Sequence, residues 1–230
     1  LRARRSKYTQ ATIGEVIKYI KNHEGRYAIV GLPCQLYGIT QAINSNATLK
    51  KRIIYKLGLV CGYTYDEDCI DGLLKVMGLQ RQVVYRILGW REGGLPGSFT
   101  VELVDGTMRS LPFIDEHSVD VTYYAQNRCR LCRDCLCENG DGVSADIGGW
   151  KERRTLVLAR SPQGQHLINM LKNTETMSIE VCRIPFEKTV LPFMLREKRS
   201  KVDIRLKKRQ GQLPIWIGGY SPILLLSQKI

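Results

Sequence analysis

Half of the cysteines in this chain lie within one stretch of nine residues, 129–137. Cys129, Cys132, Cys135 and Cys137 form this cysteine-rich run, out of eight cysteines in the sequence. Thiolates bind soft metals, and close spacing lets one loop surround an iron–sulfur cluster or a zinc ion. The run begins with the C-x2-C-x2-C spacing of bacterial ferredoxins, but its fourth cysteine follows after one residue instead of three. We therefore expect an iron–sulfur site completed by a distant cysteine.

A zinc ribbon and structural disulfides are the alternatives for these cysteines. Disulfide frameworks are typical of small secreted chains, whereas this chain has 230 residues, 43% of them hydrophobic, which is enough for a core. No stretch approaches the roughly 20 apolar residues of a transmembrane helix. The first residues lack the apolar core of a signal peptide, so we expect a soluble, cytoplasmic protein. Since the sequence does not begin with Met, we also expect it to be a piece of a longer chain.

The formal net charge of +13 predicts an acidic partner. Nucleic acid, a phosphorylated or polyglutamylated cofactor and an acidic electron carrier all fit this charge. Zinc-finger spacing and RNA-binding aromatic motifs are absent from the sequence, so we expect no nucleic acid. Part of the excess of Lys and Arg lies in a basic C-terminal cluster. Such runs of charge usually form a solvated face. The cluster consists of Arg196, Lys198, Arg199, Lys201, Arg205, Lys207, Lys208 and Arg209.

Apolar periodicity predicts a mixed α/β fold, because helices alternate with short buried strands in the first third of the chain. We expect a helix over 12–22, a strand over 27–30, a helix through 42, a strand over 53–60 and a helix over 66–77. Farther along, we expect strands over 83–88, 99–104, 107–111, 156–159 and 178–182, and a helix over 163–172. Asp105-Gly106 is a hairpin turn signal between two of these strands.

Two further cysteines follow predicted strands. Cys34 lies where a strand passes into a helix, and Cys61 ends the next strand. In an α/β sheet the carboxyl ends of strands line the ligand crevice, so these cysteines could converge there with Cys129 and its neighbours. Cys34 could alternatively be a nucleophile or a buried structural thiol. The three histidines lie in no recognisable pairing motif for a nucleophile.

A glycine-rich segment over 89–97 carries Trp90 and Arg91. Its backbone could approach a planar cofactor closely, or it could be a long hairpin connection. The segment from Asp146 to Trp150 likewise combines glycines with an aromatic residue. Neither segment matches a phosphate-binding loop or a dinucleotide fingerprint.

Five short motifs occur in one order over about residues 6–160, and together they resemble the family of coenzyme F420 hydrogenase/dehydrogenase beta subunits. They are Ser6-Lys7-Tyr8-Thr9-Gln10, Val30-Gly31-Leu32-Pro33-Cys34-Gln35, Gly58-Leu59-Val60-Cys61, Arg128-Cys129-Arg130-Leu131-Cys132 with Asp134, and Ala145-Asp146-Ile147. The sequence departs from the family pattern at Leu32 and Gly148, and in having Cys135 and Cys137. The resemblance also implies that the family's N-terminal portion, which is expected to help build the flavin site, does not lie within these residues.

The resemblance implies a flavin-binding core that carries FAD and an iron–sulfur loop that holds a [4Fe–4S] cluster. We expect this core over residues 1–195 and a basic extension over 196–230. The positions that match the cluster cysteines are Cys34, Cys61, Cys129 and Cys132, with Cys135 and Cys137 in reserve. The positions that match motifs near the flavin are Ser6, Lys7, Gln10, Gly31, Pro33, Gln35 and Asp146. We expect Gly31 to lie against the cofactor or to adopt a positive φ.

The implied function is that of an oxidoreductase subunit, which exchanges electrons between coenzyme F420, or a related substrate, and iron–sulfur partners. F420 or an acidic carrier such as ferredoxin is the expected partner, together with other subunits of a redox complex. One alternative is an electron-relay subunit that holds the cluster without flavin. Another is a ferredoxin-dependent reductase of a different substrate.

Overall fold

The computed structural model describes residues 8–94, 97–138, 140–146, 155–172, 174, 179 and 198, with the backbone alone at 142–146 and 155. The chain divides into two compact units. Unit 1 comprises Leu1–Gln10, Tyr63–Cys132 and Glu197–Ile230, and unit 2 comprises Ala11–Gly62 and Arg133–Arg196. The cysteine-rich run is therefore divided between the units after Cys132.

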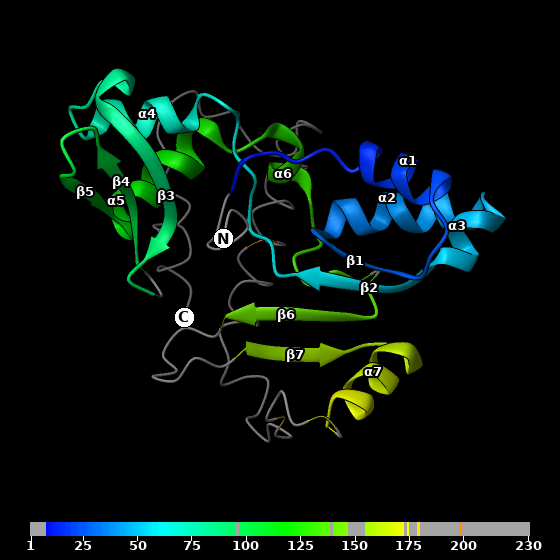
Figure 1. Cartoon of the computed structure of the whole chain (residues 1–230). Coiled ribbons are helices and arrows are strands. Elements are labelled where there is room, and N and C mark those ends of the chain that lie inside the picture. The colour runs from blue at the N-terminus through cyan, green and yellow to red at the C-terminus, as the bar shows by residue number, and fades with distance from the viewer. Residues whose placement is uncertain are drawn as a thin grey trace, which may run out of the picture. The chain divides into compact units, whose positions relative to one another are not determined.

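Unit 2 contains a four-stranded sheet in the order β1-β2-β6-β7 (Figure 1). Its strands are β1 (Tyr27–Gly31), β2 (Ile53–Leu59), β6 (Gly142–Asp146) and β7 (Thr155–Ala159). β1 pairs with β2 and β2 pairs with β6 in parallel, whereas β6 and β7 are antiparallel. Because Gly31 pairs with Gly58, the carboxyl ends of β1 and β2 meet at one edge of the sheet.

The helices of unit 2 are α1 (Gly14–Asn22), α2 (Pro33–Asn44), α3 (Ala47–Arg52) and α7 (Pro162–Lys172). Helix α2 begins at Pro33, whose fixed φ suits the first helical turn. The side chain of Asn46 caps α3 by accepting a hydrogen bond from the Leu49 backbone N–H at 2.9 Å. The core of unit 2 joins buried aliphatic side chains of α1, α2, α3, β1 and β2, namely Ile20, Leu36, Ile39, Leu49, Ile29 and Ile53.

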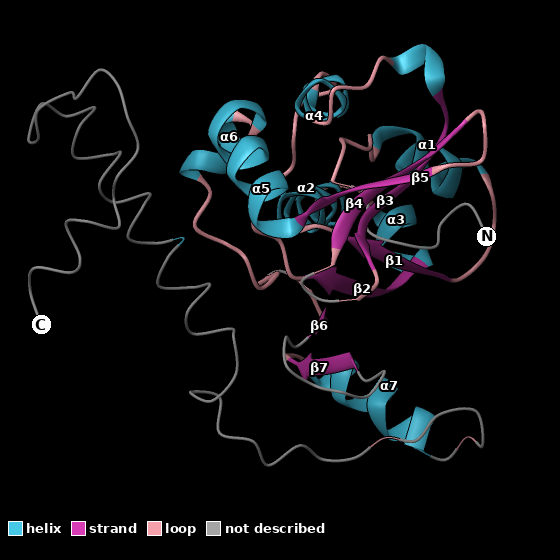
Figure 2. Cartoon of the chain, turned by 90° about the vertical axis from the view of Figure 1, so that its left-hand side faces the viewer, coloured by secondary structure: helices cyan, strands magenta, loops and turns pink. Residues whose placement is uncertain are grey.

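Unit 1 is built on an antiparallel sheet of β3 (Val84–Glu92), β4 (Ser98–Leu103) and β5 (Met108–Pro112). The predicted hairpin turn is confirmed, since Gly106 adopts a φ of 83° and the carboxylate of Asp105 accepts a hydrogen bond from the Thr107 N–H at 2.8 Å. The other elements are α4 (Cys69–Val76), η1 (Arg81–Val83), α5 (Phe113–Val119), a π-helical turn η2 (Asp120–Tyr124) and α6 (Asn127–Leu131). Helix α5 packs against β4 and β5 and also contacts α4 (Figure 2).

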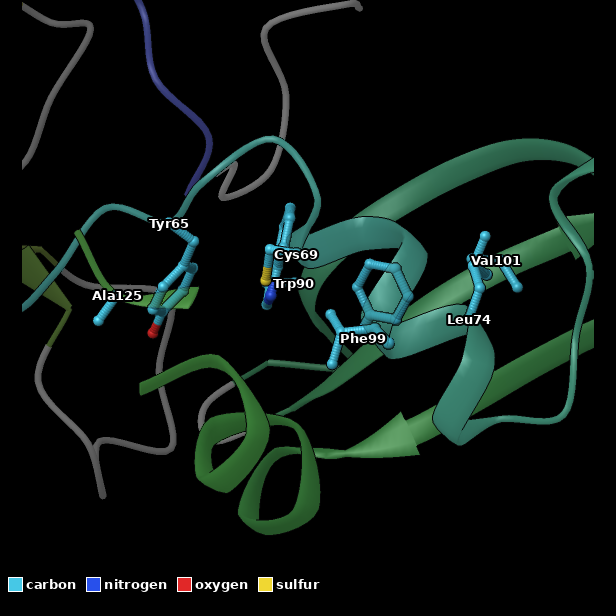
Figure 3. Packing of buried hydrophobic residues seen from close by; sticks show 8 residues of the cluster. Tyr65, Cys69, Leu74, Trp90, Phe99, Val101 and Ala125 are labelled. Carbon is cyan, nitrogen blue, oxygen red and sulfur yellow. The ribbon is translucent and has the colours of Figure 1, made fainter. Parts of the chain in front are cut away.

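The core of unit 1 is rich in aromatic side chains (Figure 3). Trp90 and Phe99 have ring centroids 5.2 Å apart, and both are almost completely buried. Tyr65, Cys69, Leu73, Leu74, Val101 and Ala125 complete the buried set. The indole of Trp90, in the glycine-rich segment, therefore belongs to the core of unit 1.

The mixed α/β class is confirmed, and the predicted helices and strands that lie in the described residues form with ends that differ by up to four residues. The predicted strand over 178–182 and the predicted boundary between 195 and 196 lie outside the described residues. The sequence did not predict α3, α5, η2, α6 or β6. Among the helices that the structure describes, none is both long and apolar enough to cross a membrane.

Candidate functional site

Cys34 and Cys61 lie beyond the same edge of the unit 2 sheet. Cys34 is the second residue of α2, directly after β1, and its side chain is exposed. Cys61 follows β2 by two residues and is half-buried. This placement follows from the parallel pairing of β1 with β2, which brings both carboxyl ends to one edge.

The second half of the cysteine-rich run packs against this edge. The backbone N–H of Cys61 donates to the carbonyl of Cys135 at 3.0 Å. The buried thiol of Cys137 donates to the carbonyl of Leu59 at 3.2 Å and also faces the carbonyl of Gly31 at 3.8 Å. Cys137 therefore bridges the ends of β1 and β2 through their backbone.

The turn that holds Cys137 has its own internal support. Asp134 accepts hydrogen bonds from the backbone N–H groups of Leu136 at 3.0 Å and Glu138 at 3.1 Å. Cys137 adopts a left-handed φ of 54°, which is uncommon for a residue with a side chain. Burial, together with the nearby carboxylate of Asp134, raises the pKa of Cys137 to about 12. Its thiol is therefore protonated in this arrangement and acts as a hydrogen-bond donor.

Cys129 and Cys132 belong to unit 1. Cys129 lies within the short helix α6, so this part of the run is helical and not the loop that we expected. Its buried sulfur lies 3.3 Å from the hydroxyl oxygen of Thr64 and accepts a hydrogen bond from the Thr64 backbone N–H at 3.5 Å. Cys132 follows the helix as its C-cap.

Arg130 fixes α6 against the preceding π-helical turn. Its guanidinium donates to the carbonyls of Val121 at 3.0 Å, Thr122 at 2.9 Å and Ala125 at 3.0 Å. These carbonyls lie at the end of a helical segment, where backbone acceptors have no helical partner. The Cys129 helix is thereby anchored by a charged side chain, a contact that the sequence motif did not reveal.

The expected flavin residues are described in part. Ser6 and Lys7 lie outside the described residues, as does the side chain of Asp146, whose backbone ends β6. The carbonyl of the exposed Gln10 side chain accepts from Arg128 at 3.2 Å. Pro33 is buried at the start of α2.

Gln35 and Gly31 have clear structural roles in unit 2. The Gln35 side chain accepts from the Leu32 N–H at 2.9 Å and donates to the Ala11 carbonyl at 2.9 Å, so both ends of its amide contact the backbone. Gly31 does not adopt a positive φ, contrary to one of our two expectations. A Cβ there would lie 3.1 Å from Leu36, which shows that the chain itself approaches this glycine closely.

Two cationic side chains that the sequence analysis singled out contact aromatic rings in unit 1. Arg91 has a φ of 67°, donates to the Tyr8 hydroxyl at 3.1 Å and places its guanidinium carbon 4.3 Å from the centre of the Phe113 ring. Lys198, which belongs to the basic C-terminal cluster, is buried with its ammonium 5.7 Å from the Tyr63 ring centre. Lys198 is thus an exception to the solvated face expected for that cluster.

The cysteine side chains of this region have the chemistry that an iron–sulfur cluster requires, because thiolates are its usual ligands. The seven cysteines of the described residues carry thiols, none of them in a disulfide. The four predicted ligands are divided two and two between the units, and within the described part of the chain no three His, Cys, Asp or Glu side chains gather as a metal site. Within the part of the chain that the structure describes, the buried amide nitrogen of Gln126, three residues before Cys129, has no hydrogen-bond partner. A buried donor three residues along the chain from a proposed ligand would suit a group that supplies acceptors, such as a sulfide cluster.

Sequence reasoning missed a buried polar group in unit 1. It consists of Cys69, Trp90, Glu116 and Asp120. The only local signal is the four-residue spacing between Glu116 and Asp120, which places both on one helix face.

Comparisons with known proteins agree with this architecture. A chain of the F420-reducing [NiFe] hydrogenase complex from Methanosarcina barkeri matches with a TM-score of 0.64 and 18% identity, covering 96% of this chain and 74% of that chain. One of the subunits of the F(420)H(2) dehydrogenase from Methanosarcina mazei is 26% identical over 175 residues, which are 75% of this chain and 46% of the relative. The chain thus spans about half the length of this curated relative.

The family comparison covers both units. The model for the C terminus of the coenzyme F420 hydrogenase/dehydrogenase beta subunit matches residues 24–183, which include all six cysteines of the predicted cluster site and its reserve. This match spans more than half of the chain, and it contains the parallel strands, the cysteine-rich run and the unit 1 sheet. The chain therefore belongs to the family of coenzyme F420 hydrogenase/dehydrogenase beta subunits.

Proposed function

We propose that this chain is a redox subunit that exchanges electrons between coenzyme F420, or a related substrate, and iron–sulfur partners. The observation that carries the proposal is that thiols lie at two defined places in the fold. Cys34 and Cys61 follow adjacent parallel strands, and Cys129 and Cys132 form a C-x2-C pair on an anchored helix. The names of the matched relatives, a component of an F(420)H(2) dehydrogenase and a chain of an F420-reducing hydrogenase complex, support the choice of substrate.

In the proposed site, Cys34, Cys61, Cys129 and Cys132 hold one [4Fe–4S] cluster, which takes up and releases single electrons. Thr64 donates to the sulfur of Cys129 through its backbone N–H. Hydrogen bonds to cluster sulfurs are among the factors that set the reduction potential. The turn from Asp134 to Cys137 holds the backbone of Cys61 in place.

FAD is the proposed second cofactor, and it would exchange a hydride with the substrate. The residues proposed near it are Ser6, Lys7, Gln10, Gly31, Pro33, Gln35 and Asp146. Residues 1–195 form the proposed core. The basic extension over 196–230 would attract an acidic substrate or carrier, such as F420 or ferredoxin, and other subunits would complete a redox complex.

A cluster-holding relay subunit without flavin is the second candidate. It is favoured by the engagement of Gln35, since both ends of the amide expected near the flavin already contact backbone groups of unit 2. The two candidates share the cluster and differ in one measurable property, the flavin content of the purified protein.

The ligand set is tested by cysteine replacement. Each of Cys34, Cys61, Cys129 and Cys132 is changed to Ser, the variants are purified without oxygen, and iron, sulfide and flavin are quantified. We expect each change to remove the cluster. Cys135→Ser is the matched control, because in unit 2 the backbone carbonyl of Cys135 accepts from Cys61 and Ser retains that carbonyl.

Three outcomes separate the possibilities. Full iron content in Cys129→Ser and Cys132→Ser would refute the proposed cluster. Loss of iron only in Cys135→Ser or Cys137→Ser would retain the cysteine-rich run but change the ligand set. A full cluster with no flavin in the parent protein would favour the relay subunit.

Substrate attraction is tested by salt dependence. Affinity for F420 and for ferredoxin is measured across a salt series, with the basic C-terminal cluster intact or changed to Gln at every position except the buried Lys198. Exposed charges are screened beyond a Debye length of about 8 Å at physiological ionic strength, so steering predicts an affinity that falls with salt. A salt-independent affinity would remove this role for the charge.

A further inference from the structure

Two carboxyl groups are buried together in unit 1. Glu116 lies on α5 and Asp120 begins the π-helical turn η2, and their four-residue spacing places them on one face. Their residues are 2% and 0% exposed, respectively. Carboxylates are almost never fully buried unless they are paired, so each needs partners inside unit 1.

Asp120 accepts hydrogen bonds at both of its oxygens. The thiol of Cys69 donates to Oδ1 at 2.9 Å, and the indole N–H of Trp90 donates to Oδ2 at 2.9 Å. Figure 3 shows the sulfur of Cys69 beside the indole nitrogen of Trp90. Both atoms donate to the Asp120 carboxylate. Burial raises the pKa of Asp120 above its ordinary value, and the donors at both oxygens oppose part of this rise by favouring the ionised form.

Glu116 and Asp120 are two buried carboxyl groups on one helical face, and a hydrogen bond between them requires a proton on one of them. Burial, the hydrogen bond to Asp120 and the negative charge of Asp120 raise the pKa of Glu116 to about 8, against the positive charge of Arg91. Two carboxylates in contact do not both ionise readily in an apolar site. Glu116 is therefore the protonated member at neutral pH.

Among the described residues, the cation whose charge acts on Glu116 is Arg91 of β3. The other titratable groups around the pair come from α4 and from the segments that precede it. They are Cys69, Tyr65, Tyr8 and Asp66. Burial and the charges of Asp120 and Glu116 raise the pKa of Tyr65, and burial and the Asp120 hydrogen bond raise that of Cys69, so both stay neutral while Glu116 titrates.

We propose that Glu116 and Asp120 form a proton-binding site that holds one shared proton at neutral pH, with Arg91 as the charge that controls its release. On release, the O–H bond of Glu116 breaks, its electron pair stays on the carboxylate, and the proton leaves to solvent buffer. The pair then carries two negative charges, which Arg91 partly offsets. A group that gives up a proton near neutral pH can serve as a general acid or base, and this site does not depend on the proposed cofactors.

Trp90 offers a direct readout, because its indole donates to Asp120. Changing Trp150 and Trp216 to Phe leaves Trp90 as the only tryptophan. We expect its fluorescence to follow a one-proton transition with a midpoint near pH 8. The transition should disappear in Glu116→Gln, whose amide still donates to Asp120 but cannot titrate.

Two matched controls sharpen the test. Glu102→Gln removes a carboxylate that pairs with the exposed Arg86 on the same sheet, and it should leave the transition unchanged. Arg91→Gln should raise the midpoint by on the order of one pH unit, because a nearby cation favours the ionised carboxylate. Arg86→Gln, which changes another cation of β3, should not move the midpoint.

Infrared spectroscopy of the parent protein keeps the test independent of how the variants fold. A protonated carboxyl group has a carbonyl stretch that a carboxylate lacks, and this band should be lost through the same transition. The proposal is overturned if the band is absent at pH 6.5, if Trp90 shows no transition between pH 6 and 10, or if the transition persists in Glu116→Gln.

Discussion

Unit 1 and unit 2 each bury a cysteine thiol, and they provide it with different partners. In unit 1 the thiol of Cys69 donates to the carboxylate of Asp120, which belongs to a group of titratable side chains. In unit 2 the thiol of Cys137 donates to the backbone carbonyl of Leu59 at the end of a strand. A side-chain partner changes its charge with pH, whereas a backbone carbonyl does not. The interior of unit 1 should therefore respond to pH, and that of unit 2 to the placement of its strands.

Shortening a buried side chain in the core of one unit should give the largest difference between the two units. Phe99 in unit 1 and Leu36 in unit 2 are both completely buried. Phe99→Ala should cost about 3–5 kcal/mol and Leu36→Ala about 2–5 kcal/mol, through lost burial and the cavity that remains. Hydrogen exchange measured by mass spectrometry should show faster exchange chiefly in the unit that carries the change.

Equal acceleration of exchange in both units by either variant would break this comparison. It would mean that the units unfold as one cooperative block. Val83→Ala, at an exposed position of unit 1, is the matched control and should leave exchange nearly unchanged.

The pH dependence of stability should differ between the units. The pKa of Glu116 is raised from 4.5 to about 8 by burial, so folding is favoured while this group is protonated. The stabilisation is complete below about pH 4.5, falls as the pH rises, and is lost by about pH 8. We expect unit 1 to lose on the order of 4–5 kcal/mol across this window.

Denaturant unfolding at pH 5 and pH 8, followed by Trp90 fluorescence, measures this loss. Glu116→Gln should abolish most of it. The thiol of Cys137 titrates at about pH 12, so it leaves unit 2 unaffected in this window. A unit 1 stability that does not change with pH would contradict the contrast between the two interiors.

The contrast also explains what the sequence could reveal. The first helices and strands of unit 2 follow apolar periodicity, and the hairpin of unit 1 follows its Asp105-Gly106 turn, which are local signals. For Glu116 and Asp120 the only local signal was their four-residue spacing, which does not indicate burial because acidic residues are normally exposed. Their burial depends on Cys69 and Trp90, which lie far away in the chain.

Only part of the arrangement of the candidate site could be predicted from the sequence. Strand order along the chain indicated that Cys34 and Cys61 follow strands, and parallel pairing places both at one edge. The spacing of the cysteine-rich run did not indicate that Cys129 and Cys132 belong to unit 1, and Cys135 and Cys137 to unit 2. Spacing alone does not show where a chain passes from one compact unit to another.

Two helical glycines offer a matched comparison of packing. A Cβ at Gly72 in α4 would collide with the Tyr124 ring, whereas a Cβ at Gly38 in α2 would meet nothing within 4 Å. Gly72→Ala should destabilise unit 1 by about 1–3 kcal/mol through overpacking. Gly38→Ala should stabilise unit 2 by about 0.5–1 kcal/mol, because Ala restricts the unfolded chain and favours the helix. Thermal unfolding of both variants measures the sign, and destabilisation by Gly38→Ala would show a contact that the structure lacks.

The smallest expected difference concerns two arginines. Arg52 of unit 2 donates to the carbonyls of Ile20 at 2.8 Å and Lys21 at 2.9 Å, near the end of α1. These carbonyls have no helical partner, so Arg52→Met should cost about 1–2 kcal/mol even though Met retains the apolar stem. Arg81 of unit 1 pairs with Asp71 at 2.6 Å, but both side chains are more than half exposed. Solvent screens such a pair, so Arg81→Met should change stability by no more than about 0.5 kcal/mol.

High salt distinguishes the two arginines further. Screening should erase the small effect of Arg81→Met, whereas the Arg52 contacts are hydrogen bonds to backbone acceptors and should persist. Urea unfolding at low and high ionic strength measures both. A salt-sensitive loss in Arg52→Met would assign its effect to the Glu24 carboxylate, which lies 4.0 Å from Arg52 and is almost fully exposed. A salt-insensitive loss would show instead that unit 2 fixes the end of α1 through its backbone, as it fixes the thiol of Cys137.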